Sequence, residues 1–232
     1  MTFDLPPALA TAPHPWSLTA KFGRLGGAGE VSPDMTQRKI AIGLLEQCLH
    51  VLAEEYARHG DDAVHGLPEG FHELWVFSER GLADRMPTLA DISAEGVRHW
   101  LAEDIDLLNM FGEPWVEPPR DVVDAVTHHW TIVAVRRLTK DLVHWLTEAM
   151  RNRPDTEDRP HYLDLLRSYA ARLDWRLGAL LVLKSWALTK PRGVDFLEEV
   201  ANNPDAPERT RAEAADLLRM HRERTPGATE QG

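Results

Sequence analysis

Four residues near the middle of the chain could act together if they share one face of a helix. Trp130, Arg137 and His144 are spaced by seven residues, and Asp141 lies between the last two. A helix turns about 100° per residue, so a step of seven returns to nearly the same face. This geometry groups His144, Arg137 and Asp141, and they are the candidate catalytic residues of the chain. The alternative is a surface pair of Arg137 with Asp141, which stabilises a helix by roughly 0.2–0.5 kcal/mol.

The spacing of Arg137 and His144 resembles that of the arginine and histidine of HEPN nucleases, helical proteins that cleave RNA without a metal ion. The resemblance implies that Arg137 would hold the phosphate and that His144 would transfer the proton. The sequence departs from the usual form of the motif at Leu138, because a polar residue commonly follows the arginine there. Metal-independent RNA cleavage is one alternative function.

Histidine stands next to tryptophan at three places, residues 99–100, 129–130 and 144–145. Tryptophans buried between helices would explain most of the 8 in the chain. The functional interpretation is an aromatic-lined pocket for a planar or apolar ligand, with a histidine as its polar contact. The candidate ligand-binding residues are Trp130, His129, Trp145 and Trp100, with His144 as a further polar contact.

The acidic and histidine residues do not form a recognised metal motif. Glu46, His50 and Glu54 are spaced by four residues, and Glu69 with His72 forms a single Glu-x-x-His motif. Di-iron bundles use two such motifs, and the sequence lacks the His-Glu-x-x-His motif of zinc enzymes. We therefore predict a solvated helix face at these residues, with no metal ligands and no cofactor.

The composition is typical of a globular protein with a strong acidic bias. Hydrophobic residues make up 43%, charged residues 27%, and the formal net charge is −11. Such a chain is repelled by nucleic acid and by anionic membranes at long range. Its single cysteine, Cys48, cannot form an internal disulfide, which favours the reducing cytoplasm. Only 5 of the 26 basic residues are lysine, a bias typical of high-GC bacterial genomes.

The spacing of apolar residues predicts an all-α protein, either a helical bundle or an irregular α-solenoid of about seven to eight helices. We expect an extended arm over 1–32, a single helical domain over 33–223 and a frayed tail over 224–232. Prolines and glycines in the first segment exclude helix there. No apolar run reaches the length of a membrane span.

The helix 120–151 should be the longest and the central one, because two apolar stripes run along it. One stripe contains Val126 and Trp130, and the other contains Leu138 and Leu142. Before this helix we expect three others: one that starts near Ser32 and ends at Gly60, a short one over 69–80, and one from Ser93 to Gly112. After it we expect four more, over 161–173, 175–189, 193–201 and 207–223.

The last part of the chain suggests a repeat. The string NNPDAPERTRAEAADLL (202–218) resembles the turn and second helix of a HEAT-like repeat, in which a Pro/Asp turn leads into an Arg- and Ala-rich helix. This unspecific resemblance extends over 175–223. The strings HWLAE and HWLTE around Trp100 and Trp145 lie 45 residues apart, a spacing that suits HEAT-like units. Chance similarity within a bundle is the alternative.

No convergent set of titratable residues dominates the sequence, which favours a non-catalytic helical protein-binding module such as an adaptor, an inhibitor of the immunity type or a regulatory protein. The expected partner is another protein, and a basic partner surface would complement the acidic chain. A small helical enzyme or ligand-binding protein with the His/Trp-lined pocket is the first alternative, and the RNA-cleaving protein is the second. Neither a membrane nor nucleic acid is expected as a partner.

Overall fold

The computed structural model describes residue 7 and residues 35–60, 89–103, 120–151, 153, 155–190 and 193–224. Every regular element in this part of the chain is helical, so the predicted all-α class is confirmed. None of the described helices has the length and apolarity that a membrane crossing requires.

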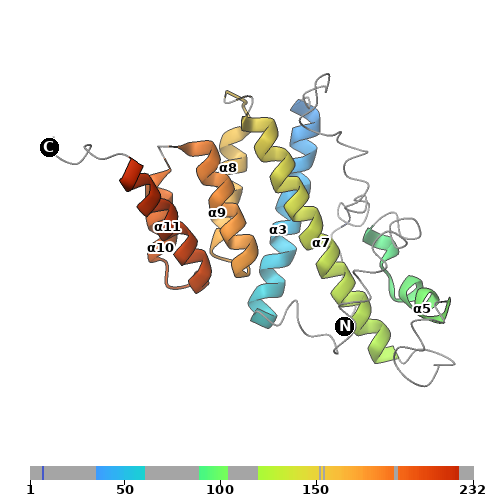
Figure 1. Cartoon of the computed structure of the whole chain (residues 1–232). Helices are drawn as coiled ribbons and strands as arrows, with labels where there is room; N and C mark the ends of the chain where they lie inside the picture. Colours follow the sequence, from blue (N-terminus) through green and yellow to red (C-terminus); the bar gives the residue numbers. More distant parts are fainter. Residues whose placement is uncertain are drawn as a thin grey trace, which may run out of the picture. The chain divides into compact units, whose positions relative to one another are not determined.

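The described part of the chain contains seven α-helices and one short 3-10 helix (Figure 1). They are α3 (Met35–His59), η2 (Leu89–Asp91), α5 (Ala94–Glu103), α7 (Arg120–Arg151), α8 (Arg159–Ala170), α9 (Trp175–Thr189), α10 (Val194–Asn202) and α11 (Glu208–Arg224). The predicted bounds of α7 and α9 agree with these, and those of α10 and α11 differ by one residue at each end. Gly60, with φ of +60°, follows α3 in the left-handed conformation that glycine favours at the end of a helix.

Several predicted elements lie outside the described residues. These are the arm over 1–32 apart from residue 7, the helix over 69–80, the part of the Ser93 helix beyond Glu103, and the tail beyond Arg224. They stay predictions.

The chain divides into two compact units. In the described residues, the first unit holds η2, α5 and α7 up to Asp141, and the second holds α3, α7 from Leu142 onward, and α8 to α11. The expectation of a single domain over 33–223 stays a prediction.

In the first unit, local capping and burial follow the sequence pattern. The Ser93 hydroxyl accepts a hydrogen bond from the Gly96 amide at 3.1 Å, which is the expected N-terminal cap of α5. Val126 and Trp130 of α7 are fully buried, as the apolar stripe predicts. Val133, three residues further along the helix, is half-buried.

In the second unit, α8 begins two residues earlier than predicted. The helix was predicted to begin at residue 161, after Pro160, but Pro160 occupies its first turn, where a missing amide hydrogen costs nothing. The helix ends at Ala170, and Leu173 is buried in the turn that follows. Asp174 then caps α9 by accepting a hydrogen bond from the Arg176 amide at 3.0 Å.

The four last helices form two hairpins that pack on each other. Helix α8 packs against α9, α10 packs against α11, and α9 packs against α11, while α3 packs against α8 (Figure 1). In the turn between α10 and α11, the Asn203 side chain accepts a hydrogen bond from the Asp205 amide at 2.9 Å. Such Asx turns reverse the chain within a few residues, so the two helices can lie side by side.

Gly178 allows α9 to approach both of its neighbours closely. A Cβ atom at this position would lie 2.5 Å from the Ala170 carbonyl oxygen and 2.8 Å from Thr210 Oγ1. The first of these atoms is backbone at the end of α8, and it cannot move without shifting that helix. A residue without a side chain is therefore required at 178.

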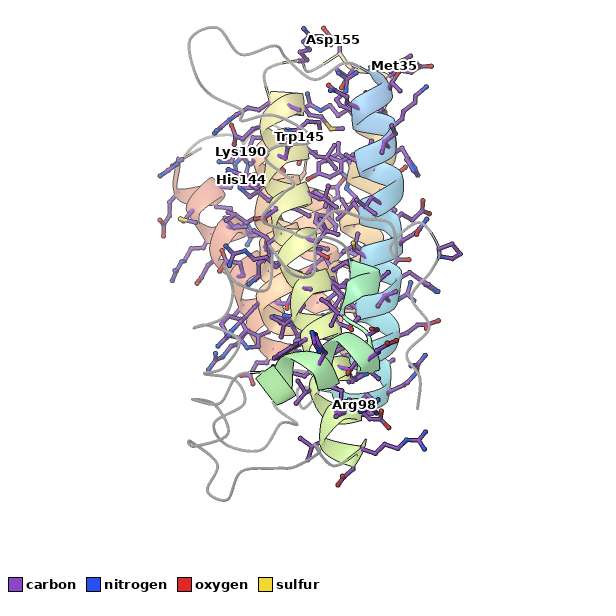
Figure 2. The ribbon with its side chains drawn as sticks, turned by 90° about the vertical axis from the view of Figure 1, so that its right-hand side faces the viewer. Met35, Arg98, His144, Trp145, Asp155 and Lys190 are labelled. Atoms are coloured by element: carbon purple, nitrogen blue, oxygen red, sulfur yellow. The ribbon has the colours of Figure 1, made fainter. Side chains whose placement is uncertain are left out.

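A buried ion pair joins α3 to the start of α8. Arg38 Nε lies 2.7 Å from Asp158 Oδ2, and the two side chains are only 6% and 3% exposed. Figure 2 shows Met35 and Asp155, close neighbours of this pair in sequence, at the same end of the unit. Since 120 residues separate the partners, the pair fixes a contact between distant parts of the chain.

Substitution of Gly178 by alanine should lower the free energy of unfolding by about 1–3 kcal/mol, because overpacking against the Ala170 carbonyl outweighs the gain in helix propensity. Gly43 of α3 is the matched control, since a Cβ there would meet nothing within 4 Å. Gly43→Ala should raise the stability by about 0.4–1 kcal/mol. Urea unfolding followed by circular dichroism measures both, and a Gly178→Ala protein as stable as the wild type would contradict the close approach.

Removal of one member of the Arg38–Asp158 pair should be more damaging than removal of both. Arg38→Met and Asp158→Leu should each cost about 3–5 kcal/mol, because each leaves a buried charge without its partner. The double variant should cost less than the sum of the two single changes. A double-mutant cycle in urea measures this coupling, and additive effects would show that the pair does not act as a unit.

Candidate functional site

His144 is an exposed side chain near the C-terminal end of α7, and it contacts α9. Its Nδ1 atom lies 3.3 Å from Lys184 Nζ. A lysine ammonium group can only donate, so His144 Nδ1 would be the acceptor in this contact. Figure 2 places His144 and Lys190 at one edge of the second unit and Trp145 further inside. His144 thus belongs to a surface that α7 and α9 share.

Tyr162 of α8 holds the segment of α7 that carries His144. Its hydroxyl donates to the Val143 carbonyl at 2.9 Å and also lies 2.9 Å from Thr147 Oγ1. The single hydroxyl hydrogen of Thr147 can go either to the same carbonyl, at 2.7 Å, or to the phenol oxygen. Burial raises the pKa of Tyr162 well above its ordinary value, and the hydrogen bond with Thr147 opposes this only in part. The phenol is therefore neutral, and it fixes the backbone directly before His144.

The other two candidate catalytic residues form a surface ion pair. Arg137 Nε lies 3.8 Å from Asp141 Oδ2, and both side chains are more than 40% exposed, at 42% and 43%. Solvent screens such a pair, and its contribution to stability is about 0–1 kcal/mol. Arg137 and Asp141 belong to the first unit and His144 to the second. Their catalytic role stays a prediction.

The predicted aromatic pocket involves side chains that are buried. Trp130 is fully buried, and Trp145 and His129 are 7% and 5% exposed. Trp100 is part of α5, and its side chain lies outside the described residues. Burial to this extent is what packing between helices produces. The pocket stays a prediction.

The acidic and histidine residues of α3 pair with one another and with arginine. His50 Nε2 lies 3.2 Å from Glu54 Oε1, and Arg58 Nη2 lies 3.0 Å from Glu54 Oε2. Within the described ranges, no three His, Cys, Asp or Glu side chains are grouped so that they could hold a metal ion. Cys48 of α3 is a fully buried free thiol.

A further surface, which the sequence reasoning missed, lies on α9. We call it the α9 face, and it consists of exposed or half-buried residues at helical spacing on α9 together with Lys190, which directly follows the helix. They are Arg176, Leu180, Leu183, Lys184, Ala187 and Lys190. Leu183 is 42% exposed, although it lies in one of the most apolar helices of the chain. The signal that could have identified this surface is the complete lack of Asp and Glu in α9.

Aromatic rings hold two of the cations of the α9 face. The Arg176 guanidinium lies over the Trp175 ring at 5.4 Å, and Arg209 of α11 lies over the same ring at 4.5 Å. Lys190 Nζ lies 5.6 Å from the centre of the Trp186 ring. Cation–π contacts of this kind contribute about 0.5–1 kcal/mol at exposed sites and restrict where the cation can move.

The charge around the α9 face differs from that of the whole chain. Residues 159–224 contain 12 Lys and Arg against 10 Asp and Glu, whereas the chain as a whole has a net charge of −11. The acidic excess therefore lies in residues 1–158. The hairpins α8–α9 and α10–α11 form a locally basic part of an acidic protein.

Comparison with models of protein families, with curated proteins and with solved structures found no match for this chain.

The raised pKa of Tyr162 predicts a loss of stability at alkaline pH. The unfolded chain releases the tyrosine proton above about pH 10 while the folded protein keeps it, so the free energy of unfolding should fall by about 1.4 kcal/mol for each further pH unit. Below pH 9 this contribution is fully present, and Tyr162→Phe should cost about 1–2 kcal/mol through its lost hydrogen bonds. Urea unfolding at several pH values from 8 to 11.5 should show the two proteins converging as pH rises, and parallel profiles would contradict the assignment.

Proposed function

We propose that this protein is a non-catalytic helical protein-binding module, of the adaptor, inhibitor or regulatory kind. The observation that carries the proposal is an exposed apolar and basic face on α9, a helix that lies within stacked hairpins. Leu183 is 42% exposed on that face. Hairpins that pack on their neighbours leave one side of each helix open, and extended helical arrays use that side to bind other chains.

The packing of α8 to α11 supports a HEAT-like interpretation of residues 175–223. In such arrays each hairpin packs on the next, as α9 packs on α11 here. The turn over 203–207 leads directly into the Arg- and Ala-rich α11. We therefore propose that α8–α9 and α10–α11 are two successive units of a short array.

The charge distribution supports two kinds of attraction for a protein partner. A basic partner surface would be attracted to residues 1–158, in which Asp and Glu exceed Lys and Arg by 12. The α9 face has the opposite sign. The charge that matters to a partner therefore depends on where it binds.

The proposal predicts that the protein forms a stoichiometric complex with another protein. The measurement is native mass spectrometry of the chain purified from its native cells, followed by calorimetric titration of the purified partner. A partner that rebinds with one-to-one stoichiometry is the expected result.

Other outcomes of the same purification would favour the alternatives. A chain that emerges alone, or with a small molecule, would contradict the binding module and favour the aromatic pocket. Co-purified RNA that the protein cleaves, with activity lost in Arg137→Ala and His144→Ala, would favour the nuclease instead.

A further inference from the structure

The centre of the α9 face is apolar and open to solvent. Leu180, Leu183 and Ala187 are spaced by three and four residues, so they form a continuous stripe along the helix. Leu183 is the most exposed leucine among the described residues, at 42%. A stripe of this kind suits a second helix with apolar residues at the same spacing.

Three cations border this stripe, namely Arg176, Lys184 and Lys190. No carboxylate of the described residues forms an ion pair with any of them. Two of the three lie over tryptophan rings, and Lys184 donates to His144. Their charges are therefore held in position and remain available to an incoming anionic group, which reduces the entropy lost on binding.

The neighbouring helices do not neutralise this charge. Glu148 of α7 lies 3.4 Å from Arg151, and Asp216 of α11 lies 3.0 Å from Arg219. Glu213 of α11 is half-buried and lies one helical turn from Arg209. The Glu148 and Asp216 carboxylates are thus paired within their own helices. The Asp174 carboxylate lies beside Arg176, whose amide donates to it at 3.0 Å, so Lys184 and Lys190 carry most of the positive charge of the α9 face.

We propose that the α9 face docks an acidic amphipathic helical segment of another protein. The inference rests on the proposed function and names the chemistry of the partner. Apolar side chains of the segment pack on Leu180, Leu183 and Ala187, and its carboxylates pair with Lys184, Lys190 and Arg176. At 1.5 Å per residue, the 15 residues of α9 span about 22 Å, which matches a partner helix of about four turns.

An acidic protein segment fits this face better than nucleic acid does. Binding to a phosphate backbone depends on many cations along the contact, and here three border an apolar centre. A leucine at the centre gives little to a phosphate chain, whereas it contributes strongly to packing against another helix.

Photo-crosslinking of the full chain in its native cells tests the proposal. Benzoylphenylalanine replaces Leu183 in one protein and Ile40 of α3, an exposed aliphatic residue at 54%, in the matched control. We expect the probe at 183 to capture peptides of another protein that are rich in Asp and Glu and carry apolar residues three and four apart. The yield should fall at least about tenfold when Lys184→Glu and Lys190→Glu are added, because the partner carboxylates are then repelled.

A charge control separates this local effect from the change in net charge. The control variant combines Lys39→Glu with Arg224→Glu, which changes the net charge by the same amount at exposed positions outside the α9 face. The crosslinking yield from position 183 should stay within about twofold of its starting level, because screening weakens distant charges. Circular dichroism of each variant checks that the fold is kept.

The other outcomes overturn the proposal in distinguishable ways. A protein partner captured only from position 40 would refute docking on the α9 face and leave the protein-binding function in place. Capture of no protein from either position would contradict that function as well. The proposed acidic segment would also be contradicted if the probe at position 183 captured a neutral or basic peptide, RNA, lipid or a second copy of this chain.

Discussion

A guanidinium that leaves water must find its partner inside the protein, because an unpaired buried charge costs several kcal/mol. In the second unit, Arg38 meets this requirement through Asp158 at 2.7 Å. The pairing also explains the unusual start of α8. Asp158 occupies the N-cap position but makes no side-chain capping hydrogen bond, since its carboxylate is turned to Arg38. Pro160 in the first turn lacks an amide hydrogen and so removes one group that would need a cap.

The position of α8 then determines where the candidate functional residues lie. Tyr162 extends from α8 to the Val143 carbonyl, and this contact fixes the part of α7 that presents His144. The end of α8 meets α9 at Gly178, where only a glycine allows the two backbones to come so close. Lys184 of α9 contacts His144. The surface shared by α7 and α9 therefore follows from contacts that begin at a buried ion pair.

Much of this fold could be predicted from local patterns, and the contacts that organise it could not. Helix α7 is marked by two apolar stripes and α11 by the Pro/Asp turn before it. The bounds of α7, α9 and α11 were predicted to within one residue. Nothing local distinguishes Arg38 from other arginines on a helix. Asp158 looks like one more acid in a polar loop, since its partner lies 120 residues away. Pro160 was misjudged because the same residue both ends loops and begins helices.

For the candidate site, too, the sequence could not predict which charged groups meet across helices or which apolar side chains stay exposed. The sequence brings Arg137 together with Asp141, and that pair is present, but the partner of His144 lies on another helix and has no local signal. The helices beside α9 determine which of its leucines remain exposed. The periodicity of the sequence alone therefore did not predict the exposure of Leu183. Net charge alone does not decide which charge a partner must carry, for a physical reason. At an ionic strength of 0.1 M, electrostatic interactions in solution are screened over about 10 Å. A docked segment therefore senses the few cations of the α9 face far more strongly than the total of −11, so the acidity of the chain does not determine the charge of every partner that it can bind.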